Sequence, residues 1–498
     1  MKVILAGYNI DSQVIAEAKA AGIPADRLSP EVLSAAYARI SRNPAPVNEL
    51  RDAARNEVAK ARKSNSKIIF GMGHHSVAEH AVFNFDIIGL SRLAIEELEH
   101  FRLCSFTEKS QRYITLENDY VMPAELEDTP FANRLKALIS RQSEVYSQLH
   151  QTLFAQLEKK FPTMVAKKSG RNTVDGWAKE DARYATLLCT AGQLGFTANA
   201  RNLELIIKRL NGAKLDELRV LAQQFYNAGT GVAPSILLFT SPSPYDLETP
   251  AEIRTIAQNA LAGRESAAPP SDAILVNSTP DADRVTAAAL LYAGSDYSYA
   301  ACQDATRAMS ADDLRNLYET AFSRMEFFDT PPREFEHVQL TFDISVSAAA
   351  FGQLKRHRMM SQSVQNYNTS LGVTIPPAID ECGLTNVFTD HAAAAERLYE
   401  DIYCELPDAA PYVLTNAHRR RVLLTTNLRD LYHFCRLRED AHAQWDIRML
   451  AQLMRTETEK VMPLGSLLLC GKDAFVQRFE TLFNRKPQID PANPSKNQ

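Results

Sequence analysis

The stretch Gln353-Leu354-Lys355-Arg356-His357-Arg358-Met359-Met360-Ser361 decides how this chain is interpreted. Its centre, Arg-His-Arg, places a guanidinium group on each side of an imidazole. It therefore offers many hydrogen-bond donors for anionic oxygens and one flat ring for stacking. Basic triplets of this kind are most often solvated helix faces. Taken alone, the triplet favours a surface over a binding site, and its meaning depends on the rest of the chain.

Length and charge narrow the possible classes of protein. The chain has 498 residues, which predicts two or more domains, and a formal net charge of −5. A slight negative charge argues against general nucleic-acid binding, although local basic clusters still bind small phosphates. The seven Cys are scattered without a C-x-x-C pair, as in reduced cytosolic proteins. No secretory signal and no apolar run of membrane-spanning length are found, so we expect a cytoplasmic protein without nucleic-acid or membrane partners.

The second half of the chain repeats features of the first half. A segment rich in Pro, Ser and Ala at 241–272, with a short helix expected at 251–262, predicts a linker. Four segments after it resemble four segments before it: Ala273–Val276 and the strand expected at 2–7, Leu340–Ile344 and Phe83–Ile87, Arg356–Ser361 and His100–Ser105, and Thr426–Arg429 and Ala198–Arg201. Such self-similarity predicts a tandem duplication, with copy one at 1–240 and copy two at 273–498.

The spacing of apolar residues, together with helix-capping and turn residues, predicts the main helices and strands of both copies. We expect strands at 2–7, 82–88, 273–276 and 340–344. We expect helices at 11–21, 30–40, 49–63, 91–102, 133–159 and 285–295, and one or two more within 198–225. The polar segment 102–113 is expected to be an ordered loop.

Several common site types are not supported by the sequence. His74, His75 and His80 lack the H-E-x-x-H spacing and a completing ligand, so no metal site is expected. Neither a G-x-G-x-x-G nor a P-loop motif occurs, which argues against those nucleotide-binding folds. No G-x-S-x-G nucleophile motif is present either. The basic cluster at 418–421 is more typical of a solvated surface or an oligomer contact.

Two polar segments leave alternatives open. The loop Glu108-Lys109-Ser110-Gln111-Arg112 can wrap a phosphate with its backbone N–H groups, hydroxyl and guanidinium, but it is equally typical of a turn with an incidental charge pair. The segment from Asn427 to Arg448 places polar groups at helical spacings on an otherwise apolar stretch. Buried ion pairing explains it as well as a binding site does.

Together these segments resemble the flavin-dependent thymidylate synthases, the ThyX family. The family signature is R-H-R-x-x-S followed by E-x-S-x-R-Y. An H-x-[ST]-x-x-E-H segment precedes it, and A-R-x-x-L, N-x-R-x-L and L-R-x-D-x-H-A-Q-W segments follow. The resemblance spans both halves, and it implies an α+β protein of two tandem ThyX-like domains, each a mixed or antiparallel sheet packed with long helices.

Each copy keeps only part of the signature. Copy one keeps His74-x-Ser76-x-x-Glu79-His80, the full Glu108-x-Ser110-Gln111-Arg112-Tyr113, Ala182-Arg183 and Asn199-x-Arg201. In copy one, His100-Phe101-Arg102 replaces R-H-R and Leu210 replaces the late Arg. Copy two keeps Gln353, Arg356-His357-Arg358, Asn427-x-Arg429, His433 and Leu437-Arg438-Glu439-Asp440. Copy two has Val364–Asn368 in place of the phosphate loop, Pro411 in place of Arg183 and Arg333 in place of Ser76.

The resemblance assigns roles to these residues. It implies that dUMP is bound by Glu108, Ser110, Gln111, Arg112, Arg183, Gln353, Arg356 and Arg438. Of these, Arg438 would lie by the uracil carbonyl as the catalytic residue. FAD would be bound by His74, Ser76, Glu79, Glu108, Arg356, His357, Arg358, Asn427, Arg429 and His433. Because family members build their sites between subunits, we expect one composite kind of site and a homodimer of two-domain chains.

The implied reaction is reductive methylation of dUMP to dTMP. Methylenetetrahydrofolate would supply the carbon, and FAD reduced by NADPH the hydride, so no enzyme nucleophile is needed. Lys109, Gln111 and His433 depart from the common family pattern. A flavin-dependent enzyme that modifies another pyrimidine nucleotide at C5 is therefore an alternative. A catalytically silent nucleotide- or flavin-binding homologue is another.

Overall fold

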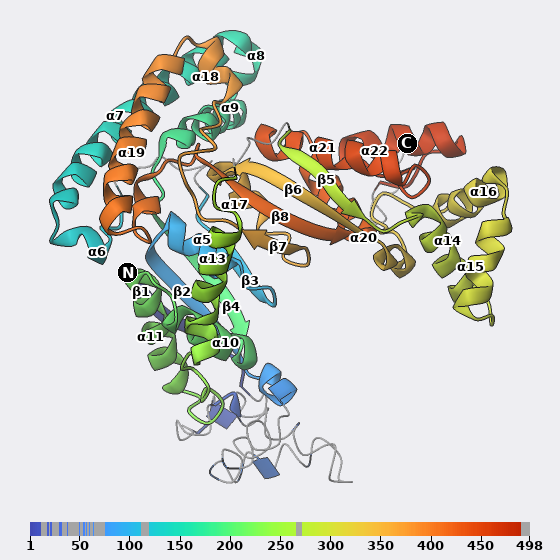
Figure 1. Ribbon diagram of the computed structural model, residues 1–498, viewed down its shortest axis with the longest axis horizontal. Helices are drawn as coiled ribbons and strands as arrows, with labels where there is room; N and C mark the ends of the chain where they lie inside the picture. Colours follow the sequence, from blue (N-terminus) through green and yellow to red (C-terminus); the bar gives the residue numbers. More distant parts are fainter. Residues whose placement is uncertain are drawn as a thin grey trace. The chain divides into compact units, whose positions relative to one another are not determined.

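The computed structural model describes residues 1–10, 75–110, 119–264 and 271–489, together with scattered single residues between 17 and 63 (Figure 1). The chain divides into two compact units. Unit 1 comprises Met1–Ser266 and Pro376–Thr415, and unit 2 comprises Ala267–Ile375 and Asn416–Gln498.

Unit 1 contains a four-stranded antiparallel sheet in the order β1-β2-β4-β3. Its strands are β1 (Lys2–Tyr8), β2 (Val82–Ser91), β3 (Cys104–Glu108) and β4 (Ala191–Asn199). Alternate residues of β2 are buried, and Phe85 lies opposite Phe196 in the register. The ring of Phe225, from helix α11 (Asp216–Thr230), lies 5.0 and 5.3 Å from these two rings, measured between centroids. One face of the sheet thus forms the core beneath its helices.

Unit 2 contains a second sheet with the equivalent order β5-β6-β8-β7, also antiparallel. Its strands are β5 (Ala273–Ser278), β6 (Gln339–Ser347), β7 (Ser361–Val364) and β8 (Arg419–Asn427). Ser361 pairs with Thr425 here, as Ser105 pairs with Thr197 in unit 1. The two sheets therefore share their strand order and their pairing at the segments that the sequence repeat matched, so the expected α+β class with two similar copies is confirmed.

Helices connect the strands in both units. Unit 1 has η3 (His75–His80), α5 (Arg92–Glu99), α6 (Ala124–Glu127), α7 (Pro130–Lys160), α8 (Pro162–Val165), α9 (Lys168–Ala182), η4 (Arg183–Ala185), α10 (Ala200–Asn211), α11 (Asp216–Thr230), α12 (Pro244–Leu247), α13 (Thr249–Ala260), α18 (Pro377–Glu381), α19 (Thr385–Glu405) and η6 (Ala410–Val413). Unit 2 has α14 (Ala282–Ala293), α15 (Tyr299–Ala308), α16 (Ala311–Phe322), η5 (Arg333–His337), α17 (Ala348–Leu354), α20 (Leu428–Arg438), α21 (Trp445–Val461) and α22 (Lys472–Phe483).

Most expected elements that fall on described residues are present, and one expectation is wrong. Residues 104–108, expected to belong to a loop, form the edge strand β3, which pairs with β4 from Cys104↔Ala198 to Glu108↔Leu194. The alternation of Ser, Phe, Thr and Glu there fits a half-buried strand, but its polar residues masked that pattern. The helices expected at 11–21, 30–40 and 49–63 lie largely outside the described residues.

The segment Pro376–Thr415 belongs to unit 1 although it lies late in the chain. Its long helix α19 packs alongside α7, as Figure 1 shows at the upper left. Tyr412 donates a 2.8 Å hydrogen bond to the buried Glu217, and the ring of His391 lies 2.9 Å from the carbonyl oxygen of Ala185. Burial of apolar faces from both copies thus builds one helical layer of unit 1.

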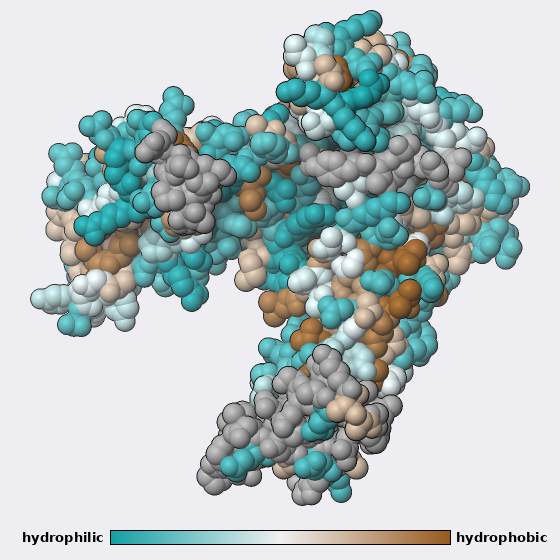
Figure 2. All heavy atoms as spheres, turned by 180° about the vertical axis from the view of Figure 1, so that it is seen from behind, coloured by the Kyte–Doolittle hydropathy of each residue, from teal (hydrophilic) through white to brown (hydrophobic). Residues whose placement is uncertain are grey.

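Helix α13, which the sequence placed in the linker, contributes little to the core. Every residue from 251 to 260 is exposed, and Ile253 and Ile256 are 61% and 67% exposed. Figure 2, which shows the opposite face of the molecule, shows that hydrophobic residues also gather in patches on the surface there. Among the described residues, none of the helices combines the length and the apolar character needed to cross a membrane.

Candidate functional site

The Arg-His-Arg triplet lies in the turn between α17 and β7, where its three side chains face different surroundings. Helix α17 begins at the N-cap Ser347, whose hydroxyl accepts from the Ala350 N–H, and it ends at Leu354. His357 is buried, whereas Arg356 is exposed and Arg358 is half-buried. The turn therefore directs the imidazole into unit 2 and keeps the first guanidinium in contact with solvent.

Arg438, the last residue of α20, meets this buried imidazole. Its Nε donates a 2.9 Å hydrogen bond to His357 Nε2, and Nη2 lies 3.3 Å from the Gln353 carbonyl oxygen. Nη1 lies 3.4 Å from Gln353 Oε1. A cation at this end of a helix is also favoured by the helix dipole. Unit 2 thus brings Arg438 into contact with Gln353 and His357, which lie 85 and 81 positions before it in the sequence.

The protonation state of His357 follows from this geometry. Burial, the Arg438 guanidinium and the nearby His433 together hold the pKa of His357 well below its ordinary value. The imidazole is therefore neutral at neutral pH, and Nε2 carries the lone pair that accepts from Arg438. The rings of His433 and Phe434 stand 6.0 and 4.8 Å from it, both edge-on. His357 thus acts as a fixed acceptor for the guanidinium.

Gln444 is a residue of this cluster that the sequence expectations omitted. It is fully buried at the N-cap of α21, and its Oε1 lies 3.4 Å from Gln353 Nε2. The same Oε1 accepts from the Ile447 N–H. Gln444 therefore links Gln353, and through it Arg438, to the start of α21. Its place in the L-R-x-D-x-H-A-Q-W segment was the signal available in the sequence.

Asn427 and Arg429, expected at the cofactor, have folding roles of their own. Asn427 is the N-cap of α20 and accepts from the Asp430 N–H at 2.8 Å. Arg429 donates to the Pro331 carbonyl oxygen, to Thr330 and to Glu336, at 2.8 to 3.2 Å. Copy one has the same two devices, because Asn199 caps α10 and Arg201 pairs with Glu79 at 2.5 Å. In both copies the Asn thus caps the helix, and the Arg attaches that helix to a 3-10 helix, η3 in copy one and η5 in copy two.

The residues of the Arg438 cluster differ between the two copies. Counting from the matched pair Arg201 and Arg429, Leu210 stands at the place of Arg438 and Leu205 at that of His433. Counting from the matched N-caps Ser91 and Ser347, Glu97 and Phe101 stand at the places of Gln353 and His357. Leu210 is buried, so copy one has apolar packing at the position where copy two has the polar cluster. The guanidinium–imidazole contact therefore belongs to copy two alone.

The expected copy-one residues that the structure describes lie in unit 1, where Glu108 forms an ion pair with Arg92. Glu108, at the end of β3, accepts a 3.0 Å ion pair from Arg92, and both side chains are nearly buried. Arg92 also reaches Glu96 at 3.3 Å. Arg92 was not anticipated, because an isolated Arg at the start of a helix gives no signal in the sequence. Its partner Glu108 is thereby fixed at the entrance to the predicted phosphate loop.

The remaining expected residues of copy one are less defined. Arg183 is buried in η4, with its Nε 3.3 Å from the Glu180 carbonyl oxygen. Ser110 is half-buried, and Ser76 and Glu79 lie on η3. His74, Gln111 and Arg112 lie outside the described residues, and their roles stay predictions.

The triplet in copy two supplies cationic donors of the kind that bind anionic groups. Arg356 is exposed and Arg358 is half-buried on either side of the buried His357 in sequence, and guanidinium groups bind phosphate bidentately. Within the described residues, no group of three or more His, Cys, Asp or Glu side chains is placed to hold a metal ion.

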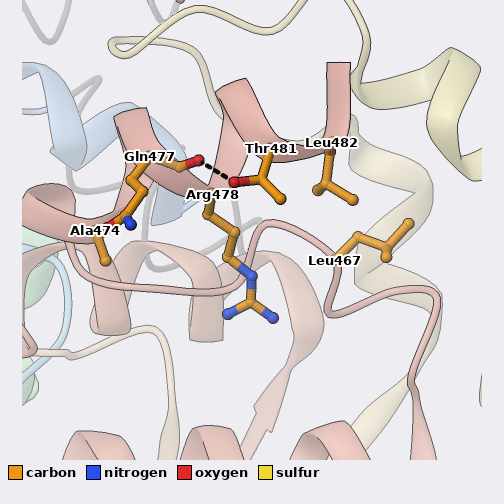
Figure 3. Close-up of a pocket in the computed structure, with 6 residues that line it drawn as sticks. All are labelled: Leu467, Ala474, Gln477, Arg478, Thr481 and Leu482. Carbon is orange, nitrogen blue, oxygen red and sulfur yellow. Dashed lines mark hydrogen bonds between the residues drawn. The ribbon is translucent and has the colours of Figure 1, made fainter. Parts of the chain in front are cut away.

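A pocket of about 390 Å³ lies elsewhere in unit 2, between α22 and the segment before it. Figure 3 shows its six lining residues, Leu467, Ala474, Gln477, Arg478, Thr481 and Leu482. Thr481 bonds back to the Gln477 carbonyl oxygen, and Arg478 donates to the Leu469 carbonyl oxygen and to Glu459 at 2.9 Å each. Arg478 and Thr481 are thus bonded within the fold, and the pocket includes none of the expected site residues.

The protein is an α+β protein with two similar copies of one sheet, and only copy two has the polar cluster around Arg438. The family model described as thymidylate synthase complementing protein matches residues 25–235 and again residues 274–464, so the chain belongs to this family. The expected resemblance is thereby confirmed, and the double match follows the two copies.

Known relatives are similar over different shares of the chain. A UPF0159 protein of Chlamydia muridarum is 27% identical over 454 residues, covering 86% of this chain and 84% of that protein. A flavin-dependent thymidylate synthase of Clostridium tetani is 27% identical over 218 residues, covering 43% of this chain and 84% of that protein. The crystal structure of a UMP/dUMP methylase PolB from Streptomyces cacaoi, with 5-Br dUMP bound, matches 43% of this chain and 97% of that one, with 22% identity and a TM-score of 0.33.

Proposed function

We propose that this chain is an FAD-dependent thymidylate synthase, which methylates dUMP reductively to dTMP with methylenetetrahydrofolate and NADPH. Membership of the family supports the proposal, as does the similarity to the thymidylate synthase of Clostridium tetani. The observation that carries it is the contact of Arg438 with His357 and Gln353, because it joins two separate family motifs in one cluster.

Arg438 is the proposed catalytic residue. Negative charge develops on the uracil ring as it is activated, and a preoriented guanidinium beside the carbonyl stabilises that charge. The neutral His357 and Gln353 hold Arg438 through three contacts of 2.9 to 3.4 Å, so little reorganisation is needed when the nucleotide binds. Gln353 and Arg356 are the proposed copy-two contacts to the nucleotide.

The remaining residues are proposed to bind the phosphate and the flavin. Ser110, Gln111, Arg112 and Arg183 would hold the dUMP phosphate, with Glu108 beside them. The flavin, when bound, supplies the redox chemistry that transfers a hydride from NADPH. Its proposed contacts are His74, Ser76, Glu79 and Glu108 of copy one, and Arg356, His357, Arg358, Asn427, Arg429 and His433 of copy two.

We also propose that the two copies complete one kind of site, in a homodimer of two-domain chains. The support is complementarity, because copy one keeps Glu108 and Ser110 where copy two has Val364 and Asn366, and copy two keeps Arg438 where copy one has Leu210. Under this proposal, Glu108→Gln alone and Arg438→Ala alone each remove nearly all turnover. Two independent sites would instead leave about half of the activity in each variant, which would refute the composite site.

Spectroscopy of the purified protein tests the reaction. We expect a yellow flavoprotein that is bleached by NADPH and reoxidised by dUMP together with methylenetetrahydrofolate. Rescue of a thymidine-requiring bacterial strain by the wild-type gene, and not by its Arg438→Ala variant, is the cellular test. Turnover with another pyrimidine nucleotide instead of dUMP would support the alternative enzyme. Bound flavin without any turnover would refute an enzymatic role.

A further inference from the structure

Charged side chains of α21 hold the residue that follows Arg438. Glu439, the C-cap of α20, forms an ion pair with Arg455, whose Nε lies 2.9 and 3.2 Å from its two carboxylate oxygens. Arg455 Nη1 lies 3.0 Å from both oxygens of Glu459, and Glu459 accepts from Arg478 at 2.9 Å. The Glu439 side chain is only 8% exposed, so this pair is shielded from the screening that weakens surface ion pairs.

The start of α22 fixes the same point from another side. A Cβ on Gly471 would lie 2.7 to 2.9 Å from Cβ, C and O of Glu439, so only glycine permits this close approach. Lys472 pairs with the buried Asp440 at 2.8 Å, and Asp473 accepts from the Ala441 N–H at 2.6 Å. Three consecutive residues after Arg438 are thus each held by α21 or α22.

The other copy of the fold shows that this network is not needed to end such a helix. Asn211 stands at the place of Glu439, directly after Leu210, which stands at the place of Arg438. Helices α11 and α21 are matched through Glu217 and Asp446, which accept from Ser91 and Ser347 at 2.6 Å each. Nine residues further on, Tyr226 stands at the place of Arg455. The late Arg and both members of the ion pair are therefore present together in one copy and absent together in the other.

We propose that Glu439 and Arg455 are positioning residues that fix the end of α20 and thereby aim the Arg438 guanidinium at His357 and the substrate. The part that concerns catalysis rests on the proposed thymidylate synthase function. The part that concerns the contact between Arg438 and His357 does not.

The first test is a kinetic double-mutant cycle. We expect Arg455→Gln to lower kcat by about tenfold or more, since small displacements of a catalytic group have large effects, while the KM for dUMP and the flavin content stay within about twofold. Glu439→Gln should act in the same direction, and Arg455→Lys should restore part of the rate. In an Arg438→Lys background, Arg455→Gln should add less than about a twofold effect, because residues that act through one another are not additive.

A matched control uses the same helix. Lys460 pairs with Glu457 on the exposed side of α21 at 2.5 Å, and Lys460→Gln should leave kcat unchanged. Equal losses from Arg455→Gln in both the wild-type and the Arg438→Lys backgrounds would overturn the proposal. An unchanged kcat in Arg455→Gln would overturn it as well. Melting temperatures of all variants identify any that fail to fold.

The second test does not need turnover. Because the Arg438 cation helps to lower the pKa of His357, displacement of Arg438 should raise that pKa toward its ordinary value. The titration of His357, followed by NMR with labelled histidine, should shift upward in Arg455→Gln and in Arg438→Gln but not in Lys460→Gln. An unshifted titration in Arg455→Gln would refute the positioning role, even if the wild-type protein proves inactive on dUMP and the proposed function fails.

Discussion

The Nε of Arg438 donates to Nε2 of His357 at 2.9 Å, joining the last residue of α20 to the middle of the Arg-His-Arg triplet. This contact explains why the triplet differs from a solvated basic cluster. Its histidine is only 9% exposed and serves as an acceptor, so the imidazole orients a cation and does not itself carry charge. The same relationship leads to the first three predictions.

Replacing Arg438 should have the largest effect on turnover. Removal of a hydrogen-bonded cation from a buried anion contact costs about 2–5 kcal/mol, so Arg438→Ala should nearly abolish dTMP formation. Arg102, an exposed residue of copy one, provides the control, and Arg102→Ala should change turnover little. Steady-state kinetics with dUMP checks both. The reverse result would mean that the active and the degenerate copies have been assigned the wrong way round.

Replacing Gln353 by Glu should weaken nucleotide binding. Gln353 Oε1 lies 3.4 Å from Arg438 Nη1, and a carboxylate there would pair with the guanidinium and compete with an anionic ligand. Copy one carries Glu97 at this place. We expect about a tenfold rise in the Kd for dUMP, measured by titration of the flavin absorbance. Gln339→Glu, at an exposed position of β6, should leave the Kd unchanged, and an equal change in both variants would indicate a general charge effect.

Acid should destabilise unit 2 through His357. Its pKa is lowered in the folded state, so below the ordinary histidine pKa the unfolded chain binds a proton that the folded chain does not. Stability therefore falls as the pH decreases through that window. Melting temperatures between pH 8 and pH 5.5, values chosen to bracket the ordinary histidine pKa of about 6.5, should fall less steeply in His357→Phe than in the wild type. The exposed His337→Gln variant should keep the wild-type slope, and an unchanged slope in His357→Phe would contradict the prediction.

Glu204 should produce the opposite dependence in unit 1. Burial raises the pKa of Glu204 from 4.5 to about 7, and its Oε1 accepts from the Phe239 N–H at 2.8 Å. Between these values the folded state retains a proton that the unfolded state has lost, so this contribution to stability falls as the pH rises. Glu204→Gln keeps the acceptor without the charge and should stabilise unit 1 by about 1 kcal/mol at pH 8. Chemical denaturation at pH 5 and pH 8 checks this, and an equal effect at both pH values would exclude the ionisation of Glu204 as the cause.

Local patterns in the sequence predicted much of the fold. The helix expected at 133–159 is α7, and the repeat of Leu340–Ile344 with Phe83–Ile87 identified β2 and β6 as matching strands. Such elements are predictable because burial of one face leaves a periodic apolar pattern. Strand β3 was missed because its polar residues hide the alternation on an edge strand, where hydrogen bonding to β4 decides the conformation.

The sequence by itself determined the internal repeat, the family and which motif residues each copy has, because these follow from residue identity and spacing. Only the tertiary structure decided what those residues touch. In the folded chain, Asn427 caps α20 and Arg429 binds the preceding 3-10 helix. Arg92 forms an ion pair with Glu108, Arg438 donates to His357, and Glu439 forms an ion pair with Arg455. Such contacts depend on how helices and turns distant in sequence pack together, and the free energy of that packing is not encoded in any single local pattern.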